Sequence, residues 1–201
     1  MSVISHDSKF IFISNARTGS TSMMDMLDKA TASHKRHYLG LGALPFEYHM
    51  SLEDSIKNHP EAADYFKCCF VRNPWSRFLS SFREFSNYWH APWNEDITRF
   101  REFEDFCLSF PSLNIRNDIH FIPLTNQIYI DGNVSMDFIG RFENYKEEVY
   151  RLFSLLRLPE PNLEHYRATT GDHYRSVYTD KSRKVIEDYY ADDIKNFNYS
   201  F

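Results

Sequence analysis

Two short apolar runs, each followed by a polar loop and a helical pattern, limit the folds open to this chain. The runs are KFIFIS at 9–14 and FKCCFV at 66–71, and their β-branched and aromatic residues predict buried strands. A third run, MDFIGRF, covers 136–142. Helical patterns follow the first two runs and cover 103–110, 143–156 and 180–197. Strands that alternate with helices predict an α/β fold with parallel strand pairing.

The length and net charge of the chain limit the number of domains and the kinds of partner that we expect. The 201 residues are enough for one domain with a sizeable core, so we expect a single domain over 1–201. Aromatic residues make up 17% of the chain, which indicates a bulky core. The net charge is −5, opposite to the balance typical of proteins that bind nucleic acid or an anionic membrane. Any anion site must therefore be local, and neither nucleic acid nor membrane is an expected partner.

The cysteines and the first residues of the chain indicate the cellular compartment that we expect for this protein. Cys68, Cys69 and Cys107 are odd in number and lack the spacing of a disulfide framework, which is typical of a reducing compartment. Residues 1–9 are polar without a secretory pattern, and no apolar run reaches transmembrane length. We expect a cytoplasmic protein. Residues 32–60 are polar and are expected to be mostly loop, and the sequence does not indicate an oligomeric state.

The loop after the first strand, Asn15 to Ser22, is suited to a phosphate or sulfate. Free N–H groups and partial positive charge at a helix N-terminus attract anions, and small residues let the backbone approach them. Ser20, Thr21 and Ser22 add hydroxyl donors and Arg17 adds a fixed charge. The loop lacks the Gly-Lys pair of a Walker A motif. An ordinary helix start with Ser and Thr caps remains an alternative for this segment alone.

A second candidate anion site follows the second strand. Arg72 lies at the carboxyl end of that strand, where open α/β sheets bind ligands. Asn73 and Pro74 then begin a helix that carries Ser80 about two turns later. Arg72 and Ser80 together could bind a second phosphate. A structural ion pair for Arg72 and a solvated serine at 80 are the alternatives.

Both segments resemble the sulfotransferase family, especially its carbohydrate sulfotransferases and their soluble bacterial relatives. The family carries a 5′-phosphosulfate loop resembling P-K-T-G-[GS]-T-S, and this chain has ARTGSTS at 16–22. It also carries a 3′-phosphate motif resembling V-R-N-P-[WY]-x-R-x-x-S, and this chain has VRNPWSRFLS at 71–80. Further similar stretches extend to the last helix. The resemblance implies a P-loop-like three-layer fold with a central, mostly parallel sheet flanked by helices.

The resemblance also implies roles for these residues. The 5′-phosphosulfate of 3′-phosphoadenosine-5′-phosphosulfate (PAPS) would contact Arg17, Thr18, Gly19, Ser20, Thr21 and Ser22. Arg72 and Ser80 would bind its 3′-phosphate. The family lysine is Arg17 here, so a guanidinium would face the leaving group. The frequent H-x-x-P-Q run of the family reads HFIPL at 120–124.

Sulfuryl transfer demands positioning and charge stabilisation, much as phosphoryl transfer does. Arg17 would stabilise the charge that develops on the leaving phosphate. The acceptor hydroxyl must lose a proton, and a neutral histidine suits this task near neutral pH. His49 is the first candidate base, because relatives place a histidine between the two phosphate motifs. His120 and Glu47 are the other candidates.

No metal is expected, since the leaving phosphate needs little proton assistance. His34 and His37 have a possible ligand spacing, but histidines of a solvated loop are the favoured interpretation. The expected activity is a PAPS-dependent sulfotransferase acting on a hydroxyl, with a carbohydrate as the favoured acceptor. The alternatives are a P-loop nucleotide kinase or NTPase and a non-catalytic module that binds a nucleotide or a glycan. Residues 32–60 and 86–118 are expected to shape the acceptor site, where Tyr88, Trp89, His90 and Trp93 could stack on a sugar.

Overall fold

The structure is a computed structural model that describes residues 2–31, 36–39, 50–87, 97, 99–163 and 171–201. The chain forms two compact units, and it passes between them three times. Unit 1 contains Met1–Val71 and Leu124–Ala168, and unit 2 contains Arg72–Pro123 and Thr169–Phe201.

A five-stranded sheet in the order β3-β1-β2-β4-β7 forms the centre of unit 1. The strands are β1 (Ser2–Ser5), β2 (Phe10–Ile13), β3 (Arg36–Leu39), β4 (Phe66–Val71) and β7 (Phe138–Arg141). β4 pairs in parallel with both β2 and β7, whereas β1 runs antiparallel to its neighbours β2 and β3. The expected mixed α/β fold with a mostly parallel sheet is thus confirmed. The carboxyl ends of β2 and β4 lie at the same edge of this sheet.

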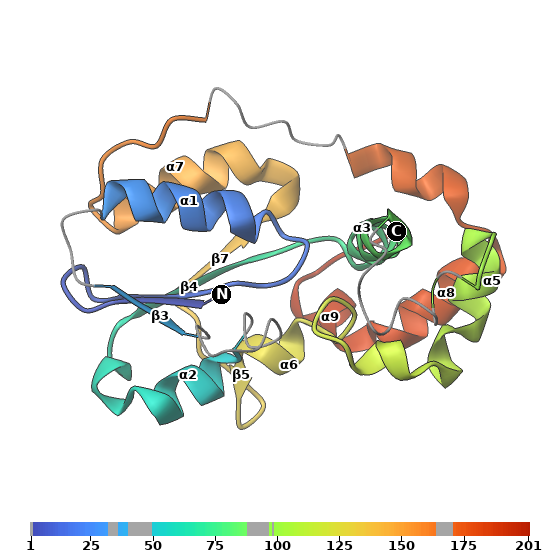
Figure 1. The fold of residues 1–201 in the computed structure, drawn as a ribbon, viewed down its shortest axis with the longest axis horizontal. Helices are drawn as coiled ribbons and strands as arrows, with labels where there is room; N and C mark the ends of the chain where they lie inside the picture. Colours follow the sequence, from blue (N-terminus) through green and yellow to red (C-terminus); the bar gives the residue numbers. More distant parts are fainter. Residues whose placement is uncertain (1, 32–35, 40–49, 88–96, 98, 164–170) are drawn as a thin grey trace. The chain divides into compact units, whose positions relative to one another are not determined.

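Helices cover both faces of the unit 1 sheet (Figure 1). The helices α1 (Ser20–Ala30) and α7 (Tyr145–Leu155) lie on one face, and α2 (Leu52–Asn58) lies on the other. The core beneath α1 and α7 includes Phe10, Phe12 and Phe70, which are all fully buried. Each buried ring of this size contributes roughly 1.5–3 kcal/mol. Gly140 in β7 leaves space for the Phe70 ring, because a Cβ at position 140 would lie 2.7 Å from Cε1 of Phe70.

A short hairpin follows α6 (Thr125–Ile128) in unit 1. Its strands are β5 (Tyr129–Ile130) and β6 (Asn133–Val134). Asp131 and Gly132 form the turn, with φ values of 50° and 75°. Two consecutive residues with positive φ are typical of a type I′ turn, for which Asp-Gly is a favoured pair.

Unit 2 is helical, and its core is built largely from aromatic rings. Its α-helices include α3 (Pro74–Asn87), α5 (Phe103–Ser109), α8 (Asp180–Tyr189) and α9 (Ala191–Asn196). Phe78 of α3 lies at the centre of the core, with ring centroids 5.4 Å from Phe106, 4.8 Å from Phe110 and 5.5 Å from Phe121. Much of the high aromatic content therefore fills this core.

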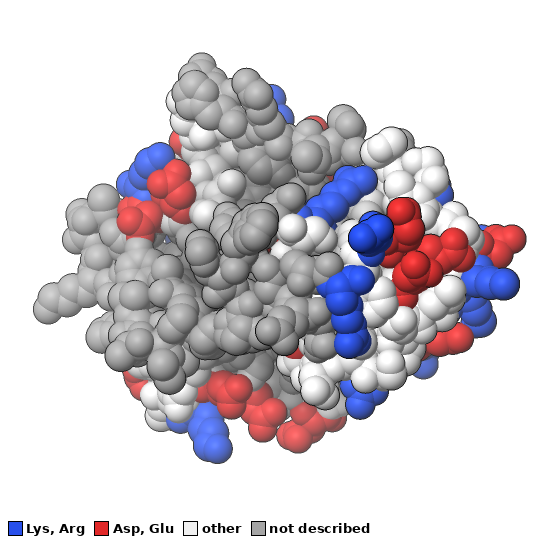
Figure 2. All heavy atoms as spheres, turned by 45° about the vertical axis from the view of Figure 1, so that its right-hand side comes forward, with Lys and Arg blue, Asp and Glu red and all other residues white. Residues whose placement is uncertain are grey.

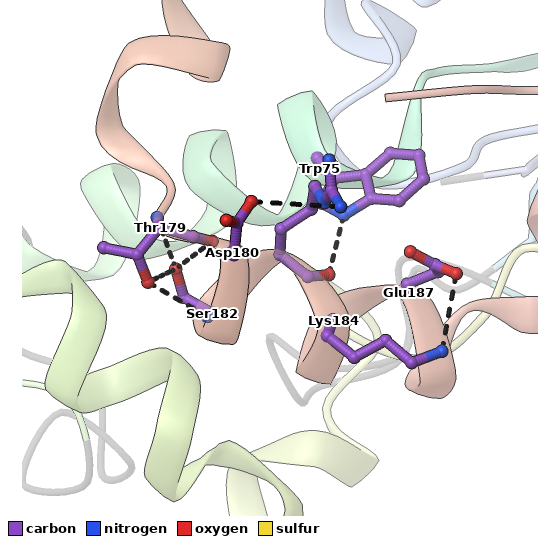
Figure 3. A network of polar contacts seen from close by, with 7 residues as sticks. Trp75, Thr179, Asp180, Ser182, Lys184 and Glu187 are labelled. Atoms are coloured by element: carbon purple, nitrogen blue, oxygen red, sulfur yellow. Dashed lines mark hydrogen bonds and ion pairs between the residues drawn. The ribbon is translucent and has the colours of Figure 1, made fainter.

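The start of α8 is fixed by polar contacts (Figure 3). Thr179 and Ser182 form a reciprocal capping box: each side chain accepts a hydrogen bond from the backbone N–H of the other residue. The indole N–H of Trp75, in the first turn of α3, donates to the carbonyl of Arg183 at 3.1 Å. α3 and α8 are thereby held together within unit 2.

Two elements differ from the expectations, at residues 2–5 and 180–197. Residues 2–5, within the polar start of the chain, form the inner strand β1, whose Ser2 hydroxyl donates to the carbonyl of Met50. The helix α2 is a short element, of the kind the expectation left room for, within the segment 32–60, and Ser51 caps it through the N–H of Asp54. The helix expected over 180–197 is two helices separated at Tyr190, whose hydroxyl bonds to the Phe121 carbonyl. No Gly or Pro marks that break.

Two further observations concern membrane-spanning helices and the distribution of surface charge. None of the helices formed by described residues combines the length and apolar character needed to cross a membrane. On the face drawn in Figure 2, described basic and acidic side chains lie side by side, without a broad area of one sign.

Candidate functional site

The loop between β2 and α1 turns sharply through two left-handed residues. Arg17 has φ 65° and Gly19 has φ 80°. The left-handed region is costly for a residue with a Cβ, by roughly 1–2 kcal/mol, so Arg17 occupies it against its preference. The chain thus bends on either side of Thr18 before α1 begins at Ser20.

Buried hydrogen bonds fix this loop to the sheet. The side-chain amide of Asn15 donates to the carbonyl of Phe70 in β4 at 2.8 Å. The hydroxyl of Thr18 donates to the carbonyl of Asn15, also at 2.8 Å. Both side chains are fully buried. Because the Thr18 hydroxyl proton is used inside the loop, Thr18 is expected to offer a ligand its backbone N–H.

The thiol of Cys69, in β4, is not a nucleophile for this site. Cys69 is fully buried, and that burial raises the pKa of its thiol far above the ordinary value. A thiol of this kind stays protonated at neutral pH and is inert. The polar chemistry near the loop is therefore left to its amides, hydroxyls and the Arg17 guanidinium.

The N-terminus of α1 is suited to an anion. Gly19 is its N-cap, no side chain makes a capping bond, and the first turn contains no acidic residue. α2 and α8, in contrast, have side-chain caps and acidic first turns. The N–H groups of a first helical turn have no acceptor within the helix, and they carry partial positive charge. Ser20 is buried, whereas Thr21 and Ser22 are exposed and able to meet a ligand.

Tyr145 of α7 supports the helix start from behind. Its hydroxyl donates to the carbonyl of Gly19 at 2.7 Å. A Cβ at Gly19 would lie 2.6 Å from Cε2 of the Tyr145 ring. Glycine is therefore required at 19 both by its positive φ and by this close approach. Sequence reasoning did not identify Tyr145, and no motif around it signals this role.

Unit 2 contains Arg72 and Ser80, the residues of the second candidate anion site. Arg72 is 8% exposed, and its Nε donates to the hydroxyl of Ser76 at 3.0 Å. Ser76 and Ser80 are one helical turn apart, on the same face of α3. The Ser76 bond orients the guanidinium of Arg72 along that face. Ser76 was missed by the sequence analysis, although its i+4 spacing from Arg72 in the motif was visible.

The second arginine of the motif, Arg77, has a structural role. It is fully buried and donates to the carbonyls of Ile122, at 2.9 Å, and Ile119, at 3.3 Å. Ser81 adds a bond to the carbonyl of His120 at 2.9 Å. These contacts fix the segment 119–122 against α3 within unit 2.

His120 is oriented by a carboxylate. Its Nδ1 lies 2.7 Å from Oδ1 of Asp118, and its ring stands edge-on to Phe85 with centroids 5.0 Å apart. The side chain of His120 is 28% exposed. A carboxylate at one ring nitrogen fixes the orientation of an imidazole. The sequence analysis named His120 but missed Asp118.

Two other predicted residues, His49 and Glu47, lie outside the described residues, as do His34 and the aromatic segment 88–93. The side chain of His37, in β3, is likewise not described. The loop Arg17–Ser22 belongs to unit 1, whereas Arg72, Ser80 and His120 belong to unit 2.

Comparison with known proteins places these features in context. The model of the Sulfotransferase family matches residues 2–200, nearly the whole chain. An uncharacterized protein from Archaeoglobus fulgidus is 28% identical over 117 residues, which cover 56% of this chain and 85% of that protein. No solved structure matches.

Proposed function

Because the chain belongs to the sulfotransferase family, we propose that it transfers a sulfuryl group from PAPS to an acceptor hydroxyl, with a carbohydrate as the favoured acceptor. The observation that carries this proposal is the start of α1. It combines a left-handed Arg17, a glycine cap and a first turn without acidic residues. These features favour an anion at the helix start, which supports a phosphosulfate there.

The loop Arg17–Ser22 is the proposed binding site of the 5′-phosphosulfate. Backbone N–H groups at the start of α1, together with the exposed hydroxyls of Thr21 and Ser22, would donate to its oxygens. Arg17 would face the bridging oxygen, which gains negative charge as the sulfur–oxygen bond breaks. Stabilising that charge with fixed donors is the main catalytic contribution available to the loop.

Arg72 and Ser80 are the proposed ligands of the 3′-phosphate. Arginine is well suited to this, because a guanidinium binds phosphate through two parallel charge-assisted hydrogen bonds. Ser76 would act as a positioning residue that holds Arg72 in place through its bond to Nε.

The proposed transfer needs no reactant other than PAPS and the acceptor hydroxyl. The acceptor oxygen forms a bond to sulfur as the bond from sulfur to the bridging phosphate oxygen breaks, and adenosine 3′,5′-bisphosphate leaves. The hydroxyl proton goes to a general base. His49 is the first candidate by resemblance, His120 is supported by its bond to Asp118, and Glu47 is the third. General-base catalysis contributes roughly 10²–10⁴-fold to a rate.

The direct test is a transfer assay with radiolabelled PAPS and a panel of sugar, phenol and lipid hydroxyls. We expect labelled product with at least one sugar. Replacing the true base, among His49→Ala, His120→Ala and Glu47→Gln, should lower kcat by about 10²-fold or more while nucleotide affinity is kept. His173→Ala, at an exposed histidine, serves as the control. Magnesium-dependent ATP turnover without transfer would instead identify a kinase or NTPase, and nucleotide binding without turnover would identify a binding module.

A further inference from the structure

A cluster of two histidines and a glutamate lies in unit 1, at the opposite end of β2 from the Arg17 loop. His6 directly follows β1, His59 ends α2, and Glu61 lies in the 3₁₀ turn Pro60–Ala62. One candidate ligand atom from each residue lies within 4.8 Å of the other two. Within the described part of the chain, no other set of three His, Cys, Asp or Glu side chains offers ligand atoms this close together.

The distances in the cluster resemble those of a tetrahedral metal site. Nδ1 of His59 lies 3.2 Å from Oε1 of Glu61, and Nε2 of His6 lies 3.9 Å from the same oxygen. Two ligands of a tetrahedral zinc ion, each about 2.0–2.1 Å from the metal, are about 3.3 Å apart. His59 and Glu61 are already at this spacing, and His6 would need only a small shift.

A second layer of contacts orients His6. Its Nδ1 bonds to the hydroxyl of Tyr65 at 3.0 Å, so its Nε2 is the nitrogen on the side of Glu61. Lys9 donates to the same Tyr65 hydroxyl at 3.0 Å, and its ammonium lies 4.7 Å from the centre of the Tyr65 ring. A bond at the second ring nitrogen is what metal-binding histidines generally have, because it fixes the ring and the tautomer.

The exposure of the cluster also suits a metal ion. The side chains of His6, His59 and Glu61 are 25%, 23% and 56% exposed. An ion can therefore enter from solvent, and water can occupy a fourth position.

We propose that His6, His59 and Glu61 bind one divalent transition-metal ion of the zinc class, with water as the fourth ligand. Two imidazoles and one carboxylate favour zinc over magnesium or calcium, which prefer oxygen ligands alone. The ion would link the turn between β1 and β2 to the segment between α2 and β4. This site is separate from the proposed transferase chemistry and does not depend on it.

The test uses the full chain, free of any histidine tag and treated with a chelator, titrated with Zn²⁺ in a calorimeter. We expect one tight equivalent that the variants Glu61→Gln and His59→Gln weaken by about tenfold or more, since loss of a direct ligand costs at least as much as loss of a supporting contact. His173→Gln, in unit 2, should bind as the wild type does. Glu61 is exposed, so its replacement by glutamine should not disturb folding.

A second readout separates this site from adventitious binding elsewhere. Co²⁺ should give the visible absorption of a four-coordinate ion in the wild type and in His173→Gln, but not in Glu61→Gln. Zn²⁺ should also raise the Tm of the wild type, because an ion that binds the folded state alone stabilises it. Unchanged Zn²⁺ affinity in both ligand variants, or no binding by the wild type, would overturn the proposal.

Discussion

Gly19 is the single residue on which the geometry of the Arg17 loop depends most. We expect Gly19→Ala to destabilise the protein for two reasons, its φ of 80° and the 2.6 Å approach of its new Cβ to Tyr145. Gly132→Ala is the matched control, since Gly132 also has a positive φ, of 75°, but no atom within 4 Å of a built Cβ. Left-handed strain alone should cost roughly 1–2 kcal/mol at Gly132. Urea denaturation should show a clearly larger loss for Gly19→Ala, and equal losses would mean that Tyr145 does not constrain the loop.

Single residues also mark the limit of sequence reasoning at the site. The chain motifs singled out Arg17 and Arg72 because each lies close to a strand end, and Ser80 because it belongs to the same motif as Arg72. Tyr145 and Asp118 could not be found in this way. Tyr145 reaches Gly19 only after α7 packs on the sheet. The role of Asp118 becomes visible only through its 2.7 Å contact with His120 in the structure.

At the scale of elements, α8 depends on its capping box. Thr179→Ala removes the acceptor for the Ser182 N–H, which Figure 3 shows. It also removes the hydroxyl that donates to Glu104 of α5 at 2.7 Å. Loss of such a cap costs about 1 kcal/mol. Thr179→Ser keeps the hydroxyl and should retain most of the stability. Thermal unfolding of both variants measures the difference, and an unchanged Tm for Thr179→Ala would show that α8 does not need this cap.

The elements that the sequence predicted best were those with strong local patterns. Residues 66–71 form β4 as expected, and the Asn73-Pro74 pair begins α3. β1 was missed because two of its four residues are serines, and its burial comes from neighbouring strands rather than from its own composition. The break between α8 and α9 was missed because no local pattern marks it. It coincides with a hydrogen bond from the Tyr190 hydroxyl to the carbonyl of Phe121, which is far away in the sequence.

At the scale of the whole molecule, the two proposed anion-binding segments follow two neighbouring strands of the sheet. β2 leads into the Arg17 loop, and β4 leads directly into Arg72. Alternation of strands and helices sufficed to predict the parallel pairing of β2 with β4. The division of the chain into two interleaved units could not be predicted, because neither composition nor a linker marks residues 71–72, 123–124 or 168–169.

Calorimetric titration with adenosine 3′,5′-bisphosphate and with AMP tests the central claim most directly, since the two ligands differ only in the 3′-phosphate. Charge-assisted hydrogen bonds of about 1.5–3 kcal/mol predict roughly 10–100-fold tighter binding of the bisphosphate. Arg72→Ala and Ser80→Ala should reduce that preference, whereas Arg83→Ala and Ser86→Ala, at exposed positions on the same helix, should keep it. Equal affinity of the wild type for both nucleotides would contradict the account.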